Sequence, residues 1–125
     1  MYPVNVENLH KEHLEWLSEI QFWKEEIHFL RLFCKKNCTD KIPNRIFFCD
    51  YYNQLDHHER LLKNLEKQIH SHENFLKEFA QDDVSMQDEG ITDHDHNRQH
   101  LKNFHITFKE MKAEIYREYE SRLIN

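Results

Sequence analysis

The chain has 125 residues, of which 38% are hydrophobic and 32% are charged, and its formal net charge is -6 with the histidines neutral. This length fits one domain spanning residues 1–125. The negative charge and the lack of a lysine and arginine stripe interleaved with aromatic residues exclude a nucleic-acid-binding class and disfavour an anionic membrane surface. One glycine and two prolines provide few turn signals, which favours long helices over strands.

The N-terminal segment lacks the basic start and apolar run of a signal peptide, and no stretch approaches the length of a membrane span. We therefore expect a cytoplasmic protein with no membrane partner. In that setting Cys34, Cys38 and Cys49 are expected to stay reduced, as small and partly buried apolar groups. The alternative is a thiolate metal site or redox pair, because Cys34 and Cys38 lie one helical turn apart and Cys49 follows the first turn.

The first predicted helix covers residues 6–37. Its apolar positions alternate spacings of three and four, which places them on one stripe of a helix: His13, Trp16, Ile20, Trp23, Ile27, Leu30 and Cys34. Phe22, Phe29 and Phe33 lie off this stripe. A second face of this helix is thus expected to be partly covered, by the third helix or by another subunit.

The second and third predicted helices cover residues 42–81 and 93–123, separated by an acidic loop at residues 82–92 that contains the only glycine. Their stripes run from Phe48 to Phe79 and from Leu101 to Tyr119. Short connections make neighbouring helices antiparallel, so the predicted fold is all-α, an antiparallel up-down-up bundle of three long helices. A coiled-coil-like helical hairpin that dimerises is the structural alternative.

Histidines gather at one end of this predicted bundle. Eight of the eleven fall where the first helix starts, the second ends and the third starts: His10, His13, His70, His72, His94, His96, His100 and His105. Helical phase places His13, His72, His94 and His105 on or beside the inward stripes. Converging imidazoles can bind a transition metal such as Zn, Cu, Ni or Fe.

Two carboxylates near these histidines, Glu12 and Glu73, are candidates for further ligands or for acceptors that orient the rings. His96 and His100 lie one turn apart and point away from the inward stripe, where they could chelate an ion at the surface. The alternatives to a metal are ordinary hydrogen bonds of the buried rings, or a response to pH around the imidazole pKa of about 6.5.

The chain resembles a family of short, functionally uncharacterised bacterial proteins predicted to be helical bundles. The resemblance spans nearly the full length and rests on these segments: His10-Lys11-Glu12-His13 followed by Trp16, residues 22–27, Asn53-Gln54, His72-Glu73 and Asp93-His94. It implies the helical-bundle fold. The family pattern has a second histidine in the second helix where this chain has Lys67.

Two functional hypotheses follow. No glycine elbow surrounds a serine and no glycine-rich phosphate loop is present, so an enzyme is the less expected class. The leading hypothesis is a non-enzymatic bundle that acts through protein-protein contacts, as a homo-oligomer or with a protein partner. The alternative is a histidine-based transition-metal-binding protein whose site lies at the end of the bundle that holds the 82–92 loop.

Overall fold

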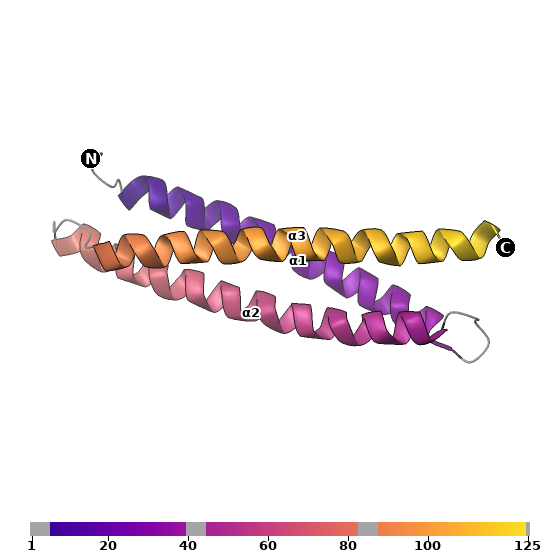
Figure 1. Cartoon of the computed structure of the whole chain (residues 1–125). Helices are drawn as coiled ribbons and strands as arrows, with labels where there is room; N and C mark the ends of the chain where they lie inside the picture. Colours follow the sequence, from indigo (N-terminus) through magenta and orange to yellow (C-terminus); the bar gives the residue numbers. More distant parts are fainter. Residues whose placement is uncertain (1–5, 40–44, 83–87, 125) are drawn as a thin grey trace.

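The structure, a computed structural model, describes residues 6–39, 45–82 and 88–124. These residues form three helices and no strand: α1 (Val6–Asn37), α2 (Arg45–Asp82) and α3 (Asp88–Ile124). Figure 1 shows the helices running antiparallel in chain order, with the start of α1, the end of α2 and the start of α3 at one end. The predicted all-α, three-helix, up-down-up architecture is confirmed.

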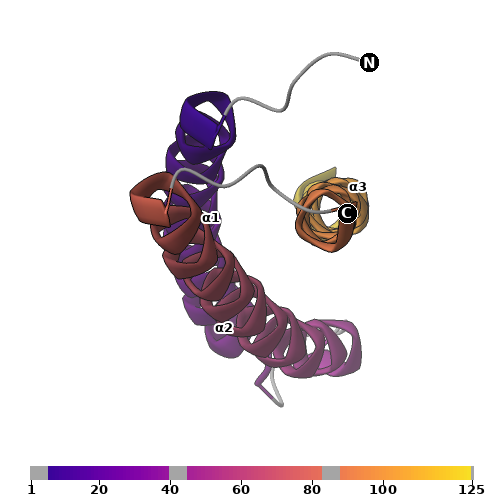
Figure 2. The ribbon, with the colours of Figure 1, turned by 90° about the vertical axis from the view of Figure 1, so that its left-hand side faces the viewer.

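The packing of the three helices is uneven. α1 and α2 form the closer pair and α2 also packs against α3, and Figure 2 shows α3 seen end-on to one side of the curved α1–α2 hairpin. α3 reaches α1 mainly through large side chains. The ring of Trp23 lies 5.1 Å from that of Phe104, and Lys112 Nζ lies 2.7 Å from Glu26 Oε2.

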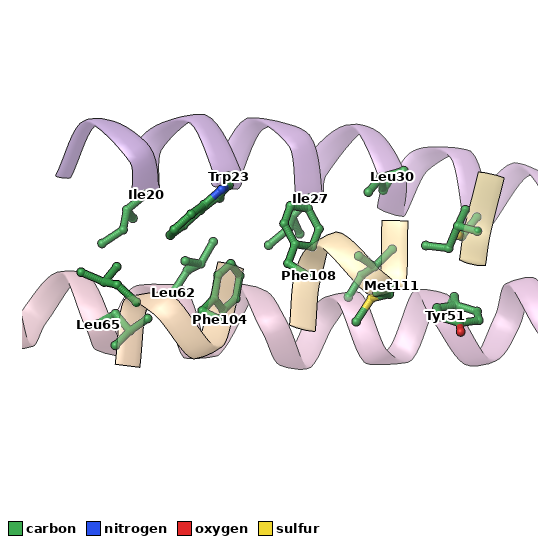
Figure 3. Packing of buried hydrophobic residues seen from close by; sticks show 14 of the residues in the cluster. Ile20, Trp23, Ile27, Leu30, Tyr51, Leu62, Leu65, Phe104, Phe108 and Met111 are labelled. Carbon is green, nitrogen blue, oxygen red and sulfur yellow. The ribbon is translucent and has the colours of Figure 1, made fainter. Parts of the chain in front are cut away.

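The core follows the apolar stripes of the sequence. Figure 3 shows Ile20, Trp23, Ile27 and Leu30 of α1 facing the side chains of α2, with those of α3 closing the third side. All seven predicted stripe residues of α1 are buried. In α2 and α3 the buried hydrophobic residues are Phe48, Tyr51, Leu55, Leu62, Leu65, Ile69, Leu76, Leu101, Phe104, Phe108, Met111 and Ile115.

The predicted helix boundaries need one correction. α1 begins and ends where predicted, and the predicted start of the second helix at residue 42 lies outside the described residues. The predicted loop 82–92 is wrong at residue 82, which ends α2, and over residues 88–92, because α3 begins at Asp88 and Gly90 lies within it; residues 83–87 lie outside the described residues. One glycine costs a helix only about 1 kcal/mol relative to alanine, so Gly90 does not by itself end a helix.

The cysteines are a second correction. Cys38 and Cys49 form a disulfide with their Cα atoms 5.0 Å apart, which is within the usual range for a disulfide. Cys34 is free and buried, and burial raises the pKa of its thiol to about 11. Disulfides are typical of oxidising compartments, and the cytoplasmic location stays a prediction. None of the described helices has a segment both long and apolar enough to cross a bilayer.

Reducing the disulfide should lower the free energy of unfolding by about 3 kcal/mol. The bond closes a short loop, with Cys38 and Cys49 separated by 11 positions, and restricts the unfolded chain accordingly. Urea unfolding with and without dithiothreitol measures the difference. The variant Cys38→Ser/Cys49→Ser should have the same free energy of unfolding as the reduced protein, and dithiothreitol should not change it. Equal stability of both forms, or three titratable thiols in the untreated denatured chain, would contradict the prediction.

Candidate metal centre

Three buried histidines, one from each helix, meet at the end of the bundle where predicted. His13 of α1, His72 of α2 and His94 of α3 are all buried. Each continues the apolar stripe of its helix: His13 is three positions before Trp16, His72 three after Ile69, and His94 seven before Leu101. The same 3.6-residue periodicity that buries the core therefore turns these rings inward.

The three rings are mutually adjacent. Ring centroids are 5.1 Å apart for His13 and His72, 4.9 Å for His13 and His94, and 5.4 Å for His72 and His94. One nitrogen of each ring lies within 4.8 Å of the others, and no other group of three or more ligating side chains of this kind occurs among the described residues. The set can therefore hold a metal ion.

The outer nitrogen of each ring donates to a different acceptor. His13 Nδ1 donates to Glu73 Oε2 at 2.5 Å, and His94 Nε2 donates to Glu12 Oε1 at 3.1 Å. His72 Nε2 donates to the backbone carbonyl of Gly90 at 2.9 Å. Carboxylates and carbonyls are the partners that orient metal-binding histidines in proteins.

Both carboxylates favour the charged form that accepts these bonds. Burial alone would raise the pKa of Glu73, but hydrogen bonds from His13 and His10 outweigh it and lower the pKa. Burial alone would also raise the pKa of Glu12, but hydrogen bonds from Arg98 and His94 outweigh it and lower the pKa. Two ionised acceptors thus keep the protons of these rings on their outer nitrogens.

The inner nitrogens are consequently left with lone pairs. His13 Nε2 and His72 Nδ1 lie 3.1 Å apart, and with both outer nitrogens protonated a neutral pair of rings has no proton to share between them. His94 Nδ1 is buried and has no hydrogen-bond partner among the described residues. Burial lowers the pKa values of His13 and His94, so protonation of these inner nitrogens is disfavoured.

The spacing of one pair of these nitrogens matches that of two ligands of a metal ion. Zinc binds histidine nitrogen at about 2.0–2.1 Å with tetrahedral angles, which separates neighbouring ligand atoms by about 3.3 Å. The 3.1 Å between His13 Nε2 and His72 Nδ1 is close to that value. Buried lone pairs that face one another without a proton are stabilised by a cation between them.

Further residues hold the two carboxylates in place. Arg98 Nη2 donates to Glu12 Oε1 at 2.7 Å, and His10 contacts Glu73 beside His13. The indole of Trp16 lies 4.7 Å from the His94 ring, and the Arg98 guanidinium lies 5.9 Å from the same indole. Each ring of the cluster is therefore fixed from outside before any ion arrives.

His105, the fourth predicted ligand, lies apart from the other three. It is exposed and its ring lies against Trp23, with centroids 5.8 Å apart. It follows His94 by 11 residues, about 16 Å along a helix. A predicted helix start at residue 93 places His105 level with His13. The observed start at Asp88 shifts that level by five residues in the direction of His94, which accounts for part of the 11-residue difference.

Two contributors to the site could not be predicted from the sequence. The pattern around Gly90 predicts a loop and gives its carbonyl no role, and Arg98 has no signal beyond its charge. Glu12 and Glu73 were named as acceptors or ligands, and the structure places both as acceptors.

Acid should destabilise the protein between pH 7 and pH 5. The pKa values of His13, His58 and His94 are lowered, in each case mainly by burial. The unfolded chain, with histidine pKa values of about 6.5, therefore binds protons that the folded chain rejects. The contribution of these histidines to the free energy of unfolding is fully present above about pH 6.5 and is lost as the pH falls below it. Urea unfolding at several pH values measures the slope.

Two neighbouring histidines provide the matched test of this acid effect. His58 is buried and donates from Nδ1 to the carbonyl of Gln54 at 2.9 Å, whereas His57 is exposed. His58→Gln should flatten part of the pH dependence, and His57→Gln should leave it intact. Identical slopes in both variants would refute the assignment to burial.

A comparison with protein-family models, with curated proteins and with solved structures found no match. The resemblance to a bacterial family of helical bundles stays a prediction. The geometry of the site is therefore the basis for the proposed function.

Proposed function

We propose that this protein binds one divalent transition metal ion through His13 Nε2, His72 Nδ1 and His94 Nδ1. The observation that carries the proposal is the inward set of lone pairs, one of them on a buried nitrogen with no partner among the described residues. Neutral imidazole suits Zn, Cu, Ni and Fe. Zinc is the first ion to test, because it accepts tetrahedral sites built from nitrogen ligands.

Three protein ligands leave one position of a tetrahedral ion for water or another small ligand. Glu12 and Glu73 are the nearest carboxylates, and both are engaged by the outer nitrogens of the rings. They act as orienting groups in this proposal. The ion would link all three helices at one end of the bundle.

Metal analysis of the full chain, purified without a histidine tag, tests the proposal. We expect one zinc per chain with submicromolar affinity, and a loss of about 100-fold or more in affinity for His72→Ala. His70→Ala is the matched control, since His70 is two positions away on α2 and exposed. Binding no tighter than micromolar in the wild type, or equal affinity in the two variants, would overturn the proposal.

A second candidate function is self-association through α1. Leu14, Phe22, Phe29 and Leu32 are each more than half exposed, with Phe22 at 60% and Phe29 at 59%. Their spacing places them on one face of α1, opposite the core. Large exposed apolar side chains along one line are typical of an interaction surface.

We favour a second copy of the chain as the partner on this face. The exposed charges of α1 change from mostly acidic near Glu15 and Glu19 to basic at Lys35 and Lys36, so an antiparallel pair of α1 helices would set acidic halves against basic halves. Sedimentation equilibrium should show a dimer that Phe22→Ser/Phe29→Ser disrupts. A strict monomer at high concentration would exclude this second function and leave the metal proposal untouched.

A further inference from the structure

A pocket of about 460 Å³ lies between α2 and α3 beside the three-histidine cluster. His72 forms part of its wall from α2, and the side chains that α3 contributes are Asp93, His96, Asn97 and His100. His72 is thus shared between this pocket and the buried cluster. The other two histidines of the pocket, His96 and His100, take no part in the buried cluster.

His96 and His100 are placed to bind one ion together. They are four positions apart on α3, which puts their Cβ atoms about 5–6 Å apart on the same helical face. Both are exposed, and both line the same pocket. Two imidazoles at this spacing can supply two ligands to one transition metal ion, with water completing its coordination.

The electrostatic surroundings favour a cation in this pocket. Asp93 contributes a carboxylate one turn before His96 and Asn97. The whole chain carries a net charge of -6 with neutral histidines, which raises the local concentration of divalent cations. The pocket therefore combines an attracting charge with two neutral ligands.

We propose that His96 and His100 form a second, exposed site for a divalent transition metal ion, and that this site passes the ion to the buried cluster past His72. The second part rests on the proposed function, whereas the exposed site stands without it. The outer site binds more weakly than the inner one, because it supplies two ligands in water rather than three that are already oriented.

Zinc titration of the full ¹⁵N-labelled chain, followed by NMR of the imidazole nitrogens, tests the proposal. The first equivalent should shift His13, His72 and His94, and a second, weaker equivalent should shift His96 and His100. The variant His96→Ala/His100→Ala should lose the second equivalent and keep the affinity of the first. Its rate of loading at low zinc should fall at least about tenfold.

The control variant is His28→Ala/His57→Ala, which removes two exposed histidines from other faces of the bundle. It should keep both equivalents and the loading rate. If the double variant at 96 and 100 retains the second equivalent, the exposed site is refuted. If it loses that equivalent and loads as fast as the wild type, the transfer step is refuted. Failure of the buried cluster alone would appear as shifts confined to His96 and His100.

Discussion

Zinc at a hundredfold excess over its dissociation constant is expected to raise the free energy of unfolding by about 2.7 kcal/mol. The ion binds only when α1, α2 and α3 bring His13, His72 and His94 together, and the unfolded chain has no such site. Urea unfolding in the presence of zinc, compared with unfolding in EDTA, measures the gain.

Two histidines of α3 discriminate between the buried cluster and a nonspecific effect of zinc. His94→Ala should abolish the stabilisation, because its Nδ1, buried and without a hydrogen-bond partner among the described residues, is one of the three proposed ligand atoms. His105→Ala should retain it, since His105 is exposed and lies against Trp23. The same stabilisation in both variants would remove the buried cluster as its source. If both variants lost the stabilisation by zinc, His105 would have to be counted as a ligand as well.

The largest loss of stability is expected from Leu62→Ala. Leu62 is 0% exposed, and Figure 3 shows it on α2 pointing toward α1 within the core. Its truncation leaves a cavity and should cost about 2–5 kcal/mol. Since a domain of this size is stabilised by about 5–15 kcal/mol in total, the melting temperature should fall by many degrees in calorimetry.

Leu61→Ala is the matched control for this substitution. Leu61 is the preceding residue, carries the same side chain and is 39% exposed. Its truncation should cost well under half as much, because much of the side chain already contacts water. Comparable losses in the two variants would mean that α2 is rotated about its axis relative to the arrangement described above.

Much of the fold could be predicted because one local property decides it. Spacings of three and four identify the buried face of a helix without knowledge of its neighbours, and every stripe residue from His13 to Cys34 is buried. The start of α3 could not be predicted in this way. A glycine in an acidic segment is typical of loops, yet one glycine costs a helix only about 1 kcal/mol relative to alanine.

The candidate site was predictable in composition and only partly in register. Phase turned His13, His72 and His94 inward, but the level at which two helices meet depends on the length of the connection between them. The start of α3 lies five residues earlier than predicted, which accounts for part of the 11-residue separation between His105 and His94. The disulfide escaped prediction for a related reason, because spacing along the chain does not fix the distance between Cys38 and Cys49 across a turn.

The uneven packing of the bundle makes α3 the first part of the molecule to open. α3 packs against the other two helices less extensively than α1 and α2 pack against each other. The disulfide joins Cys38, next to the end of α1, to Cys49 of α2 and does not involve α3. Backbone amides of α3 should therefore exchange with deuterium through partial openings that leave α1 and α2 protected. An ion held jointly by His94 and the two hairpin histidines would suppress those openings, so metal availability would set the lifetime of the docked third helix.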